Sequence, residues 1–141
     1  VTFYGLDLTG AKFTGVTNLN RAYFDNSTIL KGVEFSDTDL SDVTFYGLDL
    51  TGAKFTGVTN LSQAYFDSST ILKEADFSNT DLYGVNFLGK DLTGAKFSGA
   101  TDLRYALIDS STILKEADFS ETYLYFEPWC PVRTFAQPGS D

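Results

Sequence analysis

Histidine is absent from this chain of 141 residues, and cysteine occurs only once, as Cys130. Without histidine the chain lacks both the commonest general base and the commonest ligand of transition metals. A single cysteine cannot close a disulfide within the chain, so the redox compartment stays undetermined. We therefore expect no catalytic residue, no metal site and no cofactor, and we predict that the protein is not an enzyme.

Long hydrophobic runs and methionine are also missing. No stretch reaches the roughly 18 apolar residues that a membrane span requires, so the sequence predicts no membrane partner. Because Val1 begins a sequence without any methionine, we expect the chain to be processed, trimmed or cut from something longer. We expect a soluble protein, and the sequence does not choose between the cytoplasm and a periplasmic or lumenal compartment.

Positive charge is scarce, since ten lysines and arginines stand against nineteen carboxylates, for a net charge of −9. Such a chain lacks the basic surface that binds phosphates, so we expect no direct binding to nucleic acid. Two interpretations of the acidity are open. It can attract a basic protein surface, or it can simply keep an elongated protein soluble.

What the chain does contain is an internal repeat. Residues 1–42 and 43–84 align without gaps and agree at 33 of 42 positions, and a third copy covers residues 85–124. Each copy divides into two turns of 21 residues, and each turn into four five-residue steps plus one extra residue. Such self-similarity is typical of solenoids. We predict one repeat domain over residues 1–124, with a cap and tail over residues 125–141.

The step Ala11–Gly15 shows the pattern, which is a small residue, a polar residue, phenylalanine, a small polar residue and glycine. It returns unchanged at residues 53–57 and, with one serine for threonine, at residues 95–99. Period-two alternation places the first and third residues inside, and the last two turn a corner. Four corners per turn predict an all-β solenoid, a right-handed quadrilateral parallel β-helix of about six coils.

Stacked coils would align equivalent apolar residues in four inward columns. The first is expected to contain Phe3, Phe24, Phe45, Phe66, Phe87 and Ile108. The opposite column is expected to contain Phe13, Phe35, Phe55, Phe77, Phe97 and Phe119. The third is expected to contain Leu8, Ile29, Leu50, Ile71, Leu92 and Ile113. The fourth is expected to contain Leu19, Leu40, Leu61, Leu82, Leu103 and Leu124.

Two features interrupt this regularity. The extra residue of each turn falls near Asn18–Leu19 in the first turn of a copy and near Ile29–Leu30 in the second, and we interpret it as a bulge at a corner. Lys90 falls at an inward position that Leu6 and Leu48 occupy in the other copies. Either that face opens locally, or the lysine side chain reaches out to solvent.

Outward residues should form stripes along the solenoid. An acidic edge is expected from Asp7, Asp25, Asp49, Asp67, Asp91 and Asp109. Beside it we expect a column of tyrosines made of Tyr4, Tyr23, Tyr46 and Tyr65. A basic line is expected around the next corner from Lys12, Lys31, Lys54, Lys73, Lys96 and Lys115. A ladder of opposite charges is expected where Glu34, Asp76 and Asp118 alternate with Lys12, Lys54 and Lys96.

The acidic edge has three interpretations. Aspartate bonds its own backbone at turns, so the edge can be a solvated structural surface. It can also be a binding strip for a basic partner, and with the tyrosines beside it we take this corner as the candidate partner-binding edge. A row of weak calcium sites is the third interpretation, although ligands on separate coils do not resemble an EF-hand loop.

The two ends of the predicted solenoid differ. The repeat stops after Leu124, and the last residues contain all three prolines. We expect Phe126, Trp129 and Phe135 to cover the last apolar layer as a C-terminal cap. The first coil has no comparable cover, so we expect that end to meet upstream sequence or a partner, and an end-to-end dimer stays open.

The units AKFTG, VEFSD, ADFSN and ADFSE resemble the pentapeptide-repeat family, whose pattern is Ala, Asp or Asn, Leu or Phe, and two variable residues. The resemblance implies a right-handed quadrilateral β-helix. Some members are acidic dimers that bind DNA gyrase and topoisomerase IV by imitating the DNA duplex, which protects against quinolones. This chain differs from those members in its one-residue insertions and its near-identical copies.

Three hypotheses for function follow. The first, which we favour, is a non-catalytic structural or protein-interaction scaffold with an unidentified protein partner. The second is a DNA-mimicking binder of a type II topoisomerase. The third is an ice- or surface-binding rod, suggested by the threonine columns Thr9, Thr51, Thr93 and Thr28, Thr70, Thr112.

Overall fold

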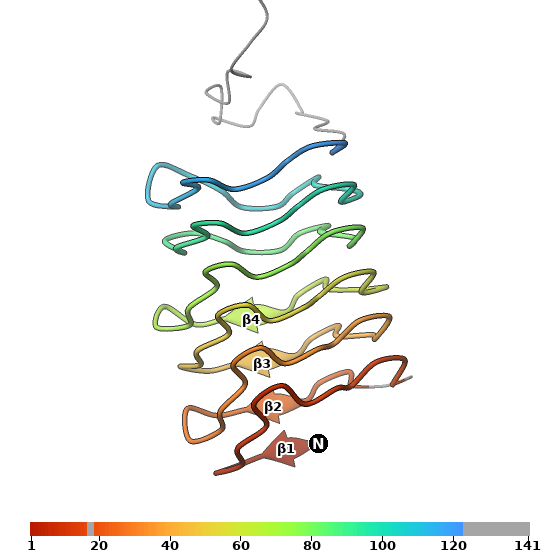
Figure 1. The fold of residues 1–141 in the computed structure, drawn as a ribbon, viewed down its shortest axis with the longest axis vertical. Helices are drawn as coiled ribbons and strands as arrows, with labels where there is room; N and C mark the ends of the chain where they lie inside the picture. The colour runs from red at the N-terminus through yellow and green to blue at the C-terminus, as the bar shows by residue number, and fades with distance from the viewer. Residues whose placement is uncertain (17–18, 123–141) are drawn as a thin grey trace, which may run out of the picture.

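The chain winds upward from the N-terminus as a stack of similar coils (Figure 1). The structure is a computed structural model, and it describes residues 1–16 and 19–122. Its named strands are β1 (Thr2–Phe3), β2 (Tyr23–Phe24), β3 (Thr44–Phe45) and β4 (Tyr65–Phe66). They form one parallel sheet in the order β1-β2-β3-β4, with each phenylalanine in register with the next. The predicted parallel stacking is confirmed.

The other sides of the coil are too short for extended strands and are joined by single bridges. Parallel bridges link Lys12 to Glu34, Asp39 to Asn60 and Asp7 to Ile29. Two-residue corners separate them, as the five-residue step predicts. The described part of the chain contains no helix, and hence none that could cross a membrane. The result is the expected all-β quadrilateral solenoid.

The two phenylalanine columns form the centre of the core. Within each column neighbouring rings stack with centroids 4.5–6.3 Å apart. Between the columns the rings meet edge to face at 5.5–6.4 Å. Both are favourable geometries for aromatic pairs. The predicted placement of these phenylalanines is confirmed.

The third predicted column was wrong in every second coil. Ile29, Ile71 and Ile113 are exposed by 49%, 41% and 49%, whereas Leu30 and Leu72 are fully buried. The cause is the extra residue, which enlarges the turn that begins at Asp25 and its equivalents. Six residues then separate one inward side chain from the next instead of five, and a one-residue shift moves side chains to the other face. The column therefore consists of leucines throughout, as Leu8, Leu30, Leu50, Leu72, Leu92 and Leu114.

Threonines occupy inward positions that the sequence analysis did not recognise as buried. Thr38 and Thr80 are completely buried, and their hydroxyls donate hydrogen bonds to the carbonyls of Phe13 and Phe55 in the coil below. Thr28 is 4% exposed and bonds the carbonyl of Phe3 in the same way. A buried hydroxyl is tolerated because it is bonded. These contacts tie each second coil of a copy to the first.

Lys90 is 3% exposed, so its side chain does not reach solvent, and that alternative was wrong. Its Nζ donates to the backbone carbonyl of Asp67 one coil below. The sheet ends at β4, and the next bridge on this side joins Asn86 to Leu107, so the ladder is interrupted where the lysine inserts. Burial lowers the pKa of Lys90, and the nearby Asp67 charge partly opposes that shift.

Several expectations lie outside the described residues. They concern the end of the repeat at Leu124, the cap made of Phe126, Trp129 and Phe135, and the environment of Cys130. These expectations stay predictions.

We expect Phe55→Ala to lower the free energy of unfolding by about 3–5 kcal/mol, because its fully buried ring is stacked between Phe35 and Phe77. Phe13→Ala is the matched control, since that ring lies in the first coil and is only partly buried. Chemical denaturation of both variants measures the difference. A smaller loss for the Phe55 variant than for the Phe13 variant would contradict the stacked-core account.

We expect Lys90→Leu to leave the free energy of unfolding unchanged or raise it by about 1–4 kcal/mol, because it replaces a buried charge with the residue found at Leu48. The reciprocal change Leu48→Lys should lower it by about 2 kcal/mol or more, since there the ladder between β2 and β3 is continuous. Thermal and chemical denaturation compare the two. Strong destabilisation by Lys90→Leu would show instead that the contact with Asp67 is a net stabiliser.

Candidate interaction surface

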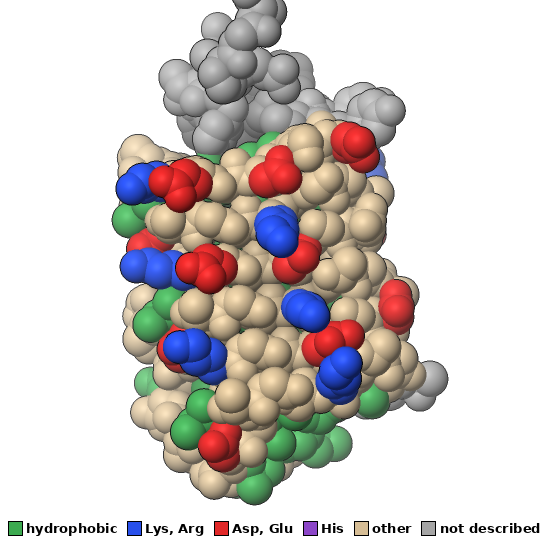
Figure 2. Space-filling view, in the orientation of Figure 1, with side chains coloured by type: hydrophobic (Ala, Val, Ile, Leu, Met, Phe, Trp, Pro, Cys, Tyr) green, Lys and Arg blue, Asp and Glu red, His purple; other side chains and the backbone are tan. Residues whose placement is uncertain are grey.

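The predicted ladder of opposite charges is confirmed. Bridges join Lys12, Glu34, Lys54, Asp76, Lys96 and Asp118 in that order along one side. Glu34 lies between two lysines, with its Oε2 3.6 Å from Lys12 Nζ and 3.7 Å from Lys54 Nζ. Figure 2 shows blue and red side chains alternating along the long axis of this view. The alternation removes like-charge contacts between coils.

The continuous acidic edge and the single basic line were both wrong. Bridges pair Asp7 with Ile29 and Asp49 with Ile71, so aspartate and exposed isoleucine alternate in one column. The reason is again the one-residue shift, which brings isoleucine to the outward position in every second coil. Lys31, Lys73 and Lys115 lie at the next corner, one residue after the buried leucines. Lys73 Nζ is 3.1 Å from Asp91 Oδ2, so this corner is also mixed in charge.

The other aspartates of the expected edge lie on the neighbouring side with the tyrosines. The register of the sheet stacks Tyr4, Asp25, Tyr46 and Asp67 in one column, which continues with Leu88 and Asp109. The column on the other side of the phenylalanines contains Thr2, Tyr23, Thr44, Tyr65, Asn86 and Leu107. Tyr4, Tyr46 and Tyr65 are exposed by 64%, 46% and 52%. The single tyrosine column was therefore wrong, because its four members are divided between two columns, and half of the predicted acidic edge is preserved as a surface of tyrosine and aspartate.

Most aspartates close their own corners. Asp7 Oδ1 accepts the backbone N–H of Thr9 at 3.0 Å, and Asp39 and Asp81 make the same bond to the residue two positions ahead. A hydrogen bond from the Thr9 hydroxyl, helped by this backbone bond, lowers the pKa of Asp7. The turn interpretation of these residues is confirmed. Within the described ranges, no group of three acidic or cysteine side chains converges on a point that could hold a metal ion.

Asp67 is the most constrained carboxylate of the surface, with only 7% exposed. Burial alone would raise its pKa. The hydrogen bonds from Thr70, the Gly47 N–H and Ser69 outweigh that effect and lower the pKa of Asp67 to about 2. Its ionised form is thus bound more tightly in the folded chain than in the unfolded one.

A cluster around Arg104 was missed at the sequence level. Arg104 forms two hydrogen bonds to Asp102, Nε to Oδ1 at 2.8 Å and Nη2 to Oδ2 at 2.6 Å. Its guanidinium lies 5.9 Å from the centre of the Tyr83 ring, and Tyr83 meets Tyr105 edge to face at 5.4 Å. The sequence did contain a signal, because these residues depart from the repeat. Tyr83 replaces Ser41 of the first copy, and Arg104 and Tyr105 replace Ser62 and Gln63 of the second.

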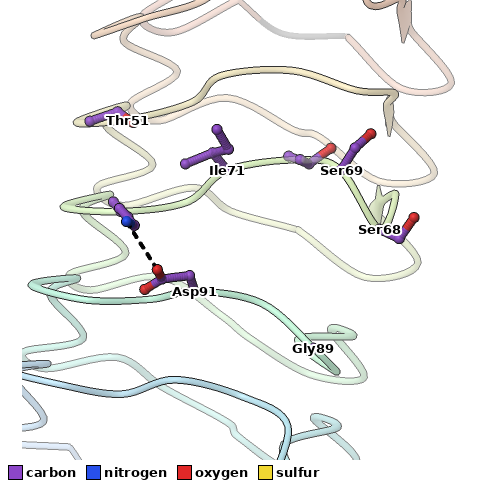
Figure 3. A pocket seen from close by; sticks show the side chains of 8 residues that line it. Thr51, Ser68, Ser69, Ile71, Gly89 and Asp91 are labelled. Atoms are coloured by element: carbon purple, nitrogen blue, oxygen red, sulfur yellow. Dashed lines mark ion pairs between the residues drawn. The ribbon is translucent and has the colours of Figure 1, made fainter.

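A shallow depression of about 400 Å³ lies between the second and third copies (Figure 3). It is lined by Thr51, Ser68, Ser69, Thr70, Ile71, Lys73, Gly89 and Asp91. The ion pair between Lys73 and Asp91 crosses it. Two of its hydroxyls, those of Ser69 and Thr70, donate hydrogen bonds to the Asp67 carboxylate, and its own carboxylate, Asp91, is bound to Lys73 and Thr93. The array required by the ice-binding hypothesis is not formed, since Thr28 and Thr70 are buried.

We expect Asp67→Ala to lower the free energy of unfolding at pH 7 by about 2 kcal/mol, because four charge-assisted bonds are lost. The pKa of Asp67 is lower in the folded state, so its contribution is complete above about pH 4 and disappears as the pH falls through about 2. The gap between variant and parent should close over that range in denaturation curves. Asp109→Ala, at the exposed equivalent position, should cost less. A pH-independent gap would refute the assignment.

Comparison with known proteins agrees with this architecture. Two family models described as pentapeptide repeats match residues 1–53 and 59–99. A search of curated proteins gives no significant match. QnrB1, a plasmid-mediated fluoroquinolone resistance protein, is 27% identical to this chain, with a TM-score of 0.62. The match covers 72% of this chain and 48% of the QnrB1 chain, so this chain spans about half the length of QnrB1. Rfr23 from the cyanobacterium Cyanothece 51142 is 18% identical with a TM-score of 0.66, over 79% of this chain and 86% of its own. With matching repeat models and the same four-sided coil, the chain belongs to the pentapeptide-repeat family.

Proposed function

We propose that the protein is a non-catalytic rod that acts as a structural or protein-interaction scaffold. The observation that carries this proposal is the fixed register of the outward columns. Inward side chains fill the core, and corner carboxylates bond their own turns. The remaining outward side chains neither fill the core nor bond a turn. They lie in columns on a rigid surface, with neighbours in a column about 4.8 Å apart along the axis. Such an arrangement favours recognition of a partner by an extended face.

Exposed tyrosines support an interaction role over a purely structural one. Tyr4, Tyr46, Tyr65, Tyr83 and Tyr105 are each at least 43% exposed. Tyrosine is enriched at protein interfaces because its ring is large and rigid and its hydroxyl can bond. A purely structural role does not account for aromatic side chains that are exposed to solvent.

A second candidate is a DNA-mimicking binder of DNA gyrase or topoisomerase IV. The likeness to QnrB1 and the net charge of −9 favour it. The ladder of alternating lysines and carboxylates argues against it, because it breaks the negative potential on that side. The scaffold therefore remains our first proposal, and the topoisomerase binder is the alternative.

Size-exclusion chromatography with light scattering, with and without purified gyrase, separates the two proposals. For the scaffold we expect no co-elution with gyrase and no protection of supercoiling against a quinolone. A stable dimer that co-elutes with gyrase and protects supercoiling would overturn the first proposal in favour of the second. The same run gives the oligomeric state, including the end-to-end dimer.

A further inference from the structure

Tyrosines and lysines are segregated around the circumference of the solenoid. All described tyrosines lie on two adjacent sides, the one with the sheet β1–β4 and the one with the Leu40 column, and we name these two sides the tyrosine side. They are Tyr4, Tyr23, Tyr46, Tyr65, Tyr83 and Tyr105. The other two sides contain the exposed lysines, and we name them the lysine side. These are Lys12, Lys31, Lys54, Lys73, Lys96 and Lys115.

Carboxylates outnumber cations on both sides, but no exposed lysine lies among the described carboxylates of the tyrosine side. Its carboxylates are Asp25, Asp39, Asp42, Asp67, Asp81, Asp102 and Asp109. Its exposed cations among the described residues are Arg21 and Arg104, and each is paired with an aspartate, at 3.9 Å to Asp42 and 2.6 Å to Asp102. Lys90 belongs to this region only as a buried residue. The lysine side also contains Glu74, Glu116 and the aspartates that alternate with isoleucine, but its six lysines lie among these carboxylates, and along the ladder the two charges alternate.

The third internal copy differs from the first two mainly on the tyrosine side. The lysine positions and the Asp–Ile column of the lysine side are the same in every copy. On the tyrosine side, Leu88 replaces Tyr46, Leu107 replaces Tyr65, and Arg104 replaces Ser62. A surface that repeats cannot fix the position of a partner along the rod, because every register is equivalent. The tyrosine side varies along the rod, so it can fix the position of a partner.

Part of this surface is already organised for contact. Arg104 is held by two bonds to Asp102 and lies over Tyr83, which in turn packs on Tyr105. Tyr83 and Tyr105 are nevertheless 43% and 67% exposed. Aromatic side chains fixed before binding lose little conformational entropy when a partner arrives.

We propose that the tyrosine side is the docking surface for an arginine- or lysine-rich segment of a partner protein. The proposal rests on the function proposed above and names the class of its partner. Aspartates such as Asp39 and Asp81 use one oxygen, Oδ1, for the turn and leave the carboxylate charge available. Tyrosine rings beside them attract arginine and lysine through their faces. The exposed cations described on the tyrosine side, Arg21 and Arg104, are both paired with aspartates, so neither strongly repels such a segment.

The test uses a fluorescein-labelled oligoarginine peptide, with oligoglutamate as the negative probe, and measures fluorescence anisotropy of the intact chain. Asp39→Asn with Asp81→Asn removes two charges from the tyrosine side. The turn is kept, because Asn60 in the same column makes the same bond to the backbone of Ser62. Asp76→Asn with Asp118→Asn is the matched control on the lysine side, where each aspartate also bonds the backbone two residues ahead.

We expect the tyrosine-side pair to weaken oligoarginine binding about five- to tenfold and the control pair less than about twofold. Tyr46→Leu with Tyr65→Leu, which copies Leu88 and Leu107, should weaken it about threefold through loss of the rings. Equal effects of the two aspartate pairs, or no effect of the tyrosine pair, would overturn the proposed surface.

The scaffold proposal is tested separately by the gyrase experiment. Absence of any binding to oligoarginine would overturn the basic partner but leave the scaffold proposal intact. Binding that is weakened only by the control pair would move the docking surface to the lysine side.

Discussion

Stacking of the two phenylalanine columns is the interaction on which the rest of the structure depends. Coils in a parallel β stack are about 4.8 Å apart, and the rings of each column lie within 4.5–6.3 Å of one another. A ring can keep that contact only if each coil stands directly above the last. The columns therefore fix the register of the coils, and the register fixes which outward residues become neighbours. The charge ladder that begins with Lys12 and Glu34 exists because Phe13 and Phe35 are stacked.

The corners solve a different problem, which is how to satisfy polar groups in a chain with very short strands. Aspartate side chains accept the backbone N–H two residues ahead, and threonine hydroxyls reach carbonyls in the coil below. As a result, none of the described buried side-chain nitrogen or oxygen atoms lacks a partner. Much of the acidity of the chain is thus structural. These carboxylates nevertheless keep their charge, because Asp39 and Asp81 use only one oxygen for the turn, so their positions decide which surface can attract a cation.

The five-residue period was sufficient to predict the solenoid, the phenylalanine columns and the charge ladder, because each depends only on residues at constant spacing. It failed where the spacing changes. At Ile29–Leu30 two apolar residues stand side by side, and the sequence alone does not say which one faces inward. The enlarged turn before them selects Leu30. The acidic edge failed for the same reason, since Ile29 and its equivalents took outward places between the aspartates. Buried Thr38 and Thr80 could not be foreseen, because their partners are carbonyls in another coil.

The arrangement of charges around the rod determines how it would meet a basic partner. At physiological ionic strength the screening length is about 8 Å, which is longer than the spacing of about 4.8 Å between coils. Opposite charges in neighbouring coils, as in the ladder of Lys12 and Glu34, therefore largely cancel at the distance of an approaching molecule. On the tyrosine side the aspartates are not interleaved with exposed lysines, so their fields add. A basic segment would be attracted to two of the four sides, which fixes its orientation around the rod before any contact is made. A DNA duplex presents negative charge around its whole circumference, whereas this chain has lysines among the carboxylates on its lysine side.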